Sequence, residues 1–382
     1  MYKRLLQKPL KTNQSFFLFG PRGTGKTQWV KKTFPNALYL DLLESNLQIK
    51  LLASPQRLEK MIPKNFKDWI IIDEVQKIPP LLDEIHRLIE KYRYKFILTG
   101  SSSRSLKRKG VNLLAGRALT YKMYPLTFLE LKKDFNLEKS LKYGFLPSIY
   151  SQNNPKEYLA SYIQSYLREE VMQEGLTRNI SSFSRFLEIA SFSQGCPLNL
   201  SEIAREASVN RKVIESYFEI IEDLLLGYRV AVFTKRAKRK MIQHPKFYYF
   251  DVGIFRSIRP MGPFDSVAEA EGPSLETLIF QEIKALNDYF DLEYQIYYWR
   301  SVNKSEVDFI LYGPKGILAI EVKRSQKYGY KDLKGLKNFG KDYPEAKLYF
   351  IYMGQRKEYD NNINILPLDV ALENLKEILD NN

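Results

Sequence analysis

Residues 16–27 read FFLFGPRGTGKT, an apolar run followed by a glycine-rich loop that closes with Lys26 and Thr27. The spacing G-x-x-x-x-G-K-T is typical of a phosphate-binding loop between a strand and a helix. Glycines allow consecutive backbone N–H groups to curl around a phosphate, because no Cβ obstructs the approach. The helix expected to start here points its positive end at the same anion. The stretch therefore predicts nucleotide binding by an α/β domain.

Each residue of this loop is expected to contact the nucleotide. The predicted set is Gly20, Pro21, Arg22, Gly23, Thr24, Gly25, Lys26 and Thr27. Lys26 can neutralise the β- and γ-phosphates, and the Thr27 hydroxyl can bind Mg²⁺. The expected cofactors are therefore ATP and Mg²⁺.

Four more apolar runs follow the loop, with helix-like segments between them. They lie at residues 37–42, 69–73, 96–100 and 119–124. Together with the first strand they predict a doubly wound parallel sheet of five strands. The run WIIIDEVQKIP ends in two acids: Asp73 can hold the Mg²⁺ shell, and Glu74 can polarise the attacking water. The pattern indicates a hydrolytic site.

Two further candidate residues lie near the ends of the later strands. Ser101, in the run FILTGSSS, is expected to contact the γ-phosphate or the attacking water, or else to belong to an ordinary polar turn. Arg117 precedes the last strand, where an arginine can act in a neighbouring subunit, sense phosphate within its own chain, or form a structural salt bridge. The sequence leaves these alternatives open.

Several segments together resemble one family of proteins. GPRGTGKT, IIIDEVQKIPPLLDEIHRLIE, FILTGSSS, NLLAGRA and YPLTFLEL look like the AAA-type ATPases of bacteria and archaea that carry a C-terminal domain of unassigned function, and the likeness continues to AIEVKRS. The resemblance implies the additional-strand, catalytic-glutamate division of P-loop ATPases, with sheet order 5-1-4-3-2. It implies the roles given above for Lys26, Thr27, Asp73 and Glu74. GFLP, at residues 144–147, has one glycine fewer than a related motif and is assigned no role.

Composition limits the remaining possibilities. Lys and Arg number 59 against 44 Asp and Glu, a formal charge of +15, which attracts nucleic acid unless it reflects only a lysine-rich proteome. The single cysteine, Cys196, excludes internal disulfides and cysteine-based zinc sites. No apolar run approaches the roughly 20 residues of a membrane helix, and the first residues lack a signal peptide. We therefore expect a cytoplasmic protein without membrane contact.

Four domains are expected in 382 residues. They are the ATPase core at 1–135, a helical lid at 136–183, a winged helix-turn-helix at 184–250 and a smaller α/β domain at 251–382. The second helix of the turn presents Arg211 and Lys212 to DNA, and the wing adds a dense run of cations: Lys235, Arg236, Lys238, Arg239 and Lys240. Winged helices can also pack on the nucleotide domain without binding DNA.

The C-terminal segment resembles the restriction-endonuclease-like nuclease fold. Asp308 lies on one strand, and Glu321 and Lys323 lie two apart on the next, after a helix that carries Glu276 and Glu282. In that chemistry Asp308 and Glu321 hold Mg²⁺ or Mn²⁺, Lys323 orients or deprotonates water, and Glu276 or Glu282 is a further ligand. A working nuclease, an inactive nuclease-like domain and an exposed ionic cluster all remain open.

Two main functions fit these features. The first is Mg²⁺-dependent ATP hydrolysis coupled to a DNA-binding winged helix and a nuclease-like domain. The alternative is a signalling-type ATP/ADP switch that binds protein or nucleic-acid partners with little turnover. The sequence leaves open whether the chain forms a homo-oligomer, which would let Arg117 act across a subunit boundary.

Overall fold

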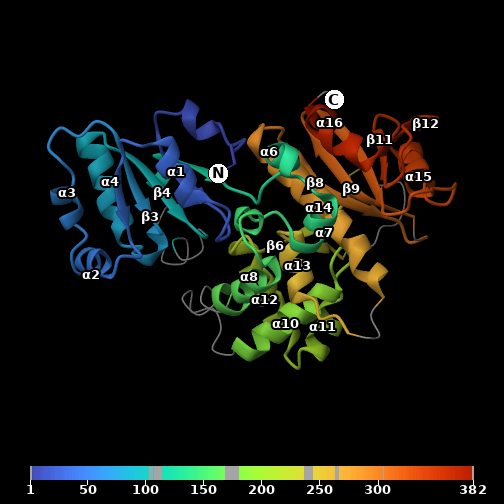
Figure 1. Cartoon of the computed structure of the whole chain (residues 1–382), viewed down its shortest axis with the longest axis horizontal. Helices are drawn as coiled ribbons and strands as arrows, with labels where there is room; N and C mark the ends of the chain where they lie inside the picture. The colour runs from blue at the N-terminus through green and yellow to red at the C-terminus, as the bar shows by residue number, and fades with distance from the viewer. Residues whose placement is uncertain are drawn as a thin grey trace. The chain divides into compact units, whose positions relative to one another are not determined.

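A computed structural model describes residues 2–102, 106, 114–167, 180–235, 244–262, 266–303 and 305–380. The described chain forms two compact units. The first contains the residues up to 125 together with Ile220–Leu226, and the second contains the described residues of 126–219 and those from 227 onward. Figure 1 shows their elements, coloured from blue at the N-terminus to red at the C-terminus.

The first unit is built on a parallel sheet of five strands. They are β1 (Ser15–Phe19), β2 (Leu38–Asp41), β3 (Trp69–Asp73), β4 (Lys95–Gly100) and β5 (Ala118–Lys122). Their order is β2-β3-β4-β1-β5, and every neighbouring pair is parallel. Read from the other edge this is 5-1-4-3-2, so the expected fold and strand order are confirmed.

Helices cover both faces of this sheet because alternate strand residues point to opposite sides. Phe17 and Phe19 face a core shared with α2 (Ser45–Ala53), α3 (Arg57–Met61) and α4 (Leu81–Tyr92). Phe16 points the other way, and its ring packs against Phe34, next to α1 (Lys26–Thr33). Figure 1 shows α1 on the opposite side of the strands from α4. The central strands are thus buried on both sides, which explains their continuous apolar sequences.

The second unit contains a mixed sheet of eight strands in the order β12-β13-β11-β10-β9-β8-β6-β7. The strands are β6 (Gly227–Val232), β7 (Lys246–Tyr249), β8 (Gln295–Arg300), β9 (Glu306–Gly313), β10 (Gly316–Lys323), β11 (Lys347–Tyr352), β12 (Glu358–Asp360) and β13 (Ile363–Pro367). β6 pairs with β7 and also with β8. The hairpin expected as a wing is therefore the end of the C-terminal sheet, and strands pair across residue 250, where we expected a domain boundary.

Helices of the second unit pack on both faces of this sheet. On one face α15 (Lys334–Asp342) inserts Leu336 and Phe339 into the core. On the other, Phe280 of α14 (Val267–Tyr289) lies 6.1 Å from the ring of Phe309. The remaining helices are α6 (Phe128–Leu131), α7 (Leu137–Tyr143), α8 (Pro155–Ser161), α10 (Ile180–Phe192), α11 (Leu200–Glu206), α12 (Arg211–Asp223), α13 (Val252–Ile258) and α16 (Leu368–Asp380).

Two helices, α11 and α12, lie where the helix-turn-helix was expected, with four residues between them. Asn210 caps α12, because its Oδ1 accepts the Val213 N–H at 2.9 Å. α11 begins one residue after Asn199, whose side chain accepts the Glu202 N–H. Short polar side chains at these positions satisfy N–H groups that the first turn of a helix leaves unpaired.

The GFLP segment has a structural role. Asp251 caps α13 by accepting the N–H groups of Gly253 and Ile254, and it also accepts the Phe145 N–H at 2.7 Å. Gly144 has φ +76°, and a Cβ there would collide with the Asp251 carboxylate. A glycine is therefore needed where this loop docks on α13.

Candidate nucleotide site and acidic cluster

The glycine-rich loop joins β1 to α1, as the sequence predicted. Gly23 and Gly25 have φ of +82° and +90°, a left-handed conformation that side chains disfavour. A Cβ on Gly20 would collide with the carbonyl oxygen of Met123. Gly25 is the N-cap of α1, so the loop ends where the helix dipole favours an anion.

Arg4 fixes this loop to the rest of its unit. Its Nη1 donates to the Thr24 carbonyl at 2.8 Å and its Nη2 to the Tyr124 carbonyl at 2.6 Å, and the side chain is buried. The sequence analysis missed Arg4, because one arginine in a basic N-terminal segment carries no local signal. The contact shows that the loop conformation depends on a residue outside its motif.

Lys26 and Thr27 lie at the end of the glycine-rich loop, where phosphate and metal contacts were predicted. The buried Lys26 Nζ donates to the Gly20 carbonyl at 2.6 Å and the Pro21 carbonyl at 3.1 Å. The Thr27 hydroxyl donates to Asp73 Oδ2 at 2.8 Å. The ammonium thus lies inside the loop, and a hydroxyl and a carboxylate stand together beside it. Oxygen donors of this kind are the ligands that Mg²⁺ prefers.

Asp73 is the centre of a hydrogen-bond cluster at the carboxyl ends of three neighbouring strands. Besides Thr27, it accepts hydrogen bonds from Tyr39 of β2 and Thr99 of β4. Burial and the hydrogen bond to Asp73 raise the pKa of Tyr39, so its hydroxyl remains a donor. Ligands of open α/β sheets bind at this edge. Tyr39 was not predicted, because only the pairing of β2 with β3 brings it to Asp73.

Glu74 follows in a left-handed conformation, with φ of +59°, which is uncommon for a residue with a side chain. Its carboxylate accepts a hydrogen bond from Gln76 Nε2, which also lies 3.3 Å from the Ser101 hydroxyl. A Cβ at Gly100 would lie 2.5 Å from Gln76 Oε1, so that glycine makes room for the amide. Ser101 therefore joins the network of Glu74 through Gln76, a residue that the sequence analysis did not single out.

Arg117 forms an ion pair with Glu90 of α4. This contact corresponds to the structural salt bridge among its three expected roles. Its side chain is partly exposed, with 39% of its surface accessible.

The second cluster lies in the C-terminal sheet. Asp308 of β9 accepts the Val322 N–H at 3.0 Å, and Glu321 and Lys323 of β10 form an ion pair of 2.7 Å. Among the described residues, Glu321 Oε2 is buried without a hydrogen-bond partner. Burial and the charge of Asp308 raise the pKa of Glu321 well above its ordinary value. The strands thus bring together the three residues that the sequence had placed in one site.

Glu276 approaches this cluster from α14. It accepts the Tyr248 hydroxyl at 3.2 Å, and a Cβ on Gly195 would lie 2.8 Å from its Oε2. Burial and Asp308 raise the pKa of Glu276 to about 8. Glu282, the expected alternative, instead accepts the Phe128 N–H at 2.7 Å at the start of α6. Glu276 is therefore the glutamate of α14 that faces Asp308.

Lys246 of β7 was not predicted as part of this cluster. Its Nζ lies 3.1 Å from Asp308 Oδ1 and 3.9 Å from Glu276 Oε2, and it also pairs with Glu306. Within the described ranges, no set of three or more His, Cys, Asp or Glu side chains is arranged to hold a metal ion. The residues around Asp308 therefore do not fit the metal centre that the nuclease resemblance implied.

The residues expected to contact DNA are only partly described. Arg211 and Lys212 are exposed at the start of α12, and Arg211 pairs with Glu215 at 3.2 Å. Lys235 places its Nζ 3.9 Å from the centre of the Tyr312 ring. The other wing cations lie outside the described residues: Arg236, Lys238, Arg239 and Lys240.

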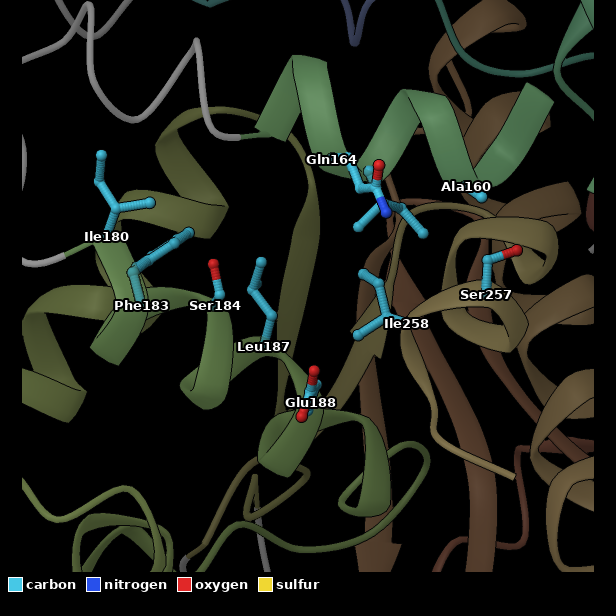
Figure 2. Close-up of a pocket in the computed structure, with 10 residues that line it drawn as sticks. Ala160, Gln164, Ile180, Phe183, Ser184, Leu187, Glu188, Ser257 and Ile258 are labelled. Atoms are coloured by element: carbon cyan, nitrogen blue, oxygen red, sulfur yellow. The ribbon is translucent and has the colours of Figure 1, made fainter. Parts of the chain in front are cut away.

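A pocket of about 340 Å³ lies elsewhere in the second unit. Figure 2 shows side chains of α10 on one side of it, with Gln164 of the π-helical segment Tyr162–Leu167 and Ile258 of α13 on the other. Phe183, Leu187 and Ile258 make its lining largely apolar, with Gln164 and Glu188 as polar groups. It shares no residue with the acidic cluster.

Comparisons with known proteins concern the domains that hold these sites. Residues 12–132 match the model of a family described as an AAA domain. Residues 134–265 and 271–370 match two domains of unknown function, DUF8612 and DUF4143. The N-terminal domain is thus similar to AAA domains, for which nucleotide binding with Mg²⁺ is typical.

Relatives of the whole chain are distant. An uncharacterized protein of Methanocaldococcus jannaschii is 25% identical over 79% of this chain and 73% of its own length. An uncharacterized protein of Haemophilus influenzae is 23% identical over 75% of this chain and 74% of its own. The solved structure of the Aeropyrum pernix ORC1 protein in complex with DNA covers 66% of this chain and 89% of that chain, with 13% identity and a TM-score of 0.29.

None of the described helices is both long and apolar enough to cross a bilayer.

Proposed function

We propose that this protein is an ATPase that hydrolyses ATP with Mg²⁺ at the carboxyl edge of its first sheet. The observation that carries the proposal is the hydrogen bond of 2.8 Å between Thr27 and Asp73, immediately before Glu74. It supports hydrolysis because a hydroxyl–carboxylate pair suited to Mg²⁺ lies beside a carboxylate suited to orient water.

Each residue then has a defined task. Lys26 exchanges the carbonyls of Gly20 and Pro21, which its Nζ now contacts, for phosphate oxygens. Thr27 and Asp73 would hold Mg²⁺, which neutralises charge that develops on the phosphates. Glu74 accepts a hydrogen bond and then a proton from the attacking water, and Gln76 orients the Glu74 carboxylate.

Replacement of Glu74 by Gln tests this proposal, because it removes the charge while keeping the shape. Phosphate release should fall by about a hundredfold or more, while nucleotide affinity stays the same. Glu59→Gln is a matched control, because Glu59 pairs with Arg87 on the surface of the same unit. Equal turnover in the Glu74 variant and the wild type would contradict the proposal. Tight nucleotide binding by a wild type without turnover would favour the ATP/ADP switch.

A nucleic-acid partner is a second proposal. It is supported by the exposed Arg211 and Lys212 at the start of α12 and by the formal charge of +15. Binding to duplex DNA should weaken with salt, with a slope of about −0.9 in log affinity against log salt for each phosphate neutralised. Replacing both Arg211 and Lys212 by Ala should make the salt dependence of DNA binding less steep. Lys50→Ala, at an exposed site on α2, should leave it unchanged. A flat salt response would contradict DNA binding.

We further propose that the C-terminal domain binds its partner without cleaving nucleic acid. Lys246 supports this, because an ammonium lies where the carboxylates converge. Plasmid DNA incubated with the protein and Mg²⁺ or Mn²⁺ should stay intact. Cleavage that disappears in both Asp308→Ala and Lys323→Ala would overturn the proposal and establish the nuclease.

A further inference from the structure

The acidic cluster of the C-terminal sheet is organised around the ammonium of Lys246. Carboxylates approach it from two elements, Glu306 and Asp308 from β9 and Glu276 from α14. The Lys246 side chain is 1% exposed, so it has little contact with solvent. A buried lysine is stable only when nearby charges compensate for the lost hydration. The cluster provides that compensation.

Lys246 is held firmly in this position by its surroundings. It belongs to β7, in which Tyr248, two positions further on, stacks against Phe280 of α14 with ring centres 4.8 Å apart. The Tyr298 ring lies 5.4 Å from the Lys246 Nζ on another side. Aromatic rings therefore pack around Lys246 in addition to the carboxylates.

A divalent cation cannot share this space with the ammonium. Mg²⁺, Mn²⁺ and Ca²⁺ need oxygens about 2.0–2.6 Å away that all point at one centre. Here Asp308 Oδ1 and Glu306 contact Nζ instead, and a metal beside it would be repelled by the positive charge in a medium of low dielectric constant. The Asp308 and Glu306 oxygens that a metal would use are therefore committed to Lys246, while Glu321 pairs with Lys323.

We propose that Lys246 is the built-in counter-cation of this site and takes the place of a divalent metal. Without its side chain, Asp308, Glu276 and Glu306 lose their counter-charge and rearrange around a divalent cation instead. Glu306 also pairs with Arg300 at 3.3 Å, so Asp308 and Glu276 provide most of the affinity gained. This inference rests on the proposal that the domain does not cleave nucleic acid, but metal binding and cleavage are measured separately.

Mn²⁺ binding to the nucleotide-free full chain, followed by electron paramagnetic resonance, tests the inference. Lys246→Ala should bind one more Mn²⁺ than the wild type. The affinity of this additional site should be at least about tenfold higher than the affinity of any wild-type Mn²⁺ site that depends on Asp308. The gain should disappear in Lys246→Ala/Asp308→Asn. Because the nucleotide site is unchanged in all these variants, it contributes equally to each.

Two further variants separate the effect of the positive charge from the effect of the side-chain volume. Lys246→Arg keeps the positive charge and should bind no additional Mn²⁺, whereas Lys246→Met removes the charge but fills the volume and should show a smaller gain than Ala. If Lys246→Ala does not fold, Lys246→Met and the wild type remain informative. Wild-type Mn²⁺ binding that is lost in Asp308→Asn would overturn the inference, as would folded Ala and Met variants that bind no additional ion. Plasmid cleavage by the wild type would contradict the proposed function instead.

Discussion

Thr27 and Asp73 lie 46 residues apart in the chain, yet a hydrogen bond of 2.8 Å joins the Thr27 hydroxyl to Asp73 Oδ2. Thr27 is in the first turn of α1, and Asp73 ends β3, two strands away from β1 in the sheet. β4 lies between them and contributes Thr99 to the other Asp73 oxygen. The parallel order of the strands therefore assembles the site where a bound Mg²⁺ would find its ligands.

Thr27→Ala should weaken the Mg²⁺ dependence of ATP hydrolysis. Because the hydroxyl is lost while Asp73 keeps its other donors, the apparent Mg²⁺ affinity should fall by about ten- to hundredfold with little loss of stability. Thr27→Ser retains the hydroxyl and should resemble the wild type. The measurement is phosphate release over a Mg²⁺ titration at saturating ATP. Identical titrations for the Ala and Ser variants would show that Thr27 does not contact the metal.

Gln76 is predicted to act as a positioning residue for Glu74. Its amide donates to the Glu74 carboxylate and contacts Ser101 at 3.3 Å. Gln76→Ala should lower kcat by about tenfold without changing KM, because it loosens the orientation of the base but not the nucleotide contacts. Gln76→Glu places a second carboxylate beside Glu74 and should also shift the pH profile to higher pH. A rise in KM with kcat unchanged would contradict the role.

Glu282 should make the second unit less stable as pH rises. Burial raises the pKa of Glu282 to about 8, from an ordinary value of 4.5. Between these values the folded protein holds a proton that the unfolded chain has released, so its contribution is complete below pH 4.5 and is lost as pH rises to about 8. The difference in the free energy of unfolding is on the order of a few kcal/mol.

Glu282→Gln removes this titration and keeps an oxygen that can accept the Phe128 N–H. The variant should match the wild type at pH 5 and be more stable than the wild type at pH 8, as measured by chemical denaturation. Glu202→Gln, at an exposed site on α11, should leave the pH dependence unchanged. If the stability of Glu282→Gln falls with pH as steeply as that of the wild type, another group is responsible for the pH dependence.

Gly144 and Gly272 allow the effect of an added Cβ on stability to be compared at a crowded and at an open position. Gly144 has φ +76° and no room for a Cβ beside Asp251, so Gly144→Ala should destabilise the second unit by about 2 kcal/mol or more. Gly272 lies within α14 and a Cβ there would meet no atom within 4 Å. Gly272→Ala should therefore change the stability by less than about 1 kcal/mol, because the gain in helix propensity is offset by the following Pro273, whose ring disfavours a Cβ on the preceding helical residue. Equal effects of the two changes on thermal unfolding would contradict this account of the GFLP loop.

The strand positions of the first unit were predictable because they depend on local patterns. The apolar runs at residues 37–42, 69–73 and 96–100 correspond to Leu38–Asp41, Trp69–Asp73 and Lys95–Gly100. Strands buried on both faces have continuous apolar sequences, so their limits are visible in the chain itself. The strand order came from the family resemblance rather than from spacing, and the structure confirms it.

The supporting residues of both sites were not predictable in the same way. Tyr39, Gln76 and Arg4 are ordinary residues in their local sequence, and only strand pairing and the packing of the N-terminal segment bring them to the loop and to Asp73 and Glu74. Lys246 was assigned to the neighbourhood of a wing, because nothing in the sequence shows that β6 pairs with β8. That pairing makes β7 part of the C-terminal sheet.

The sequence by itself determined the glycine-rich loop, the acids at the end of β3 and the α/β character of the first unit, because each depends on a short spacing or on the periodicity of one element. The tertiary structure decided which distant side chains meet these residues. It also decided that an ammonium, from residue 246, lies among the carboxylates around Asp308. Contacts between segments far apart in the chain depend on strand order and register, which no local pattern specifies.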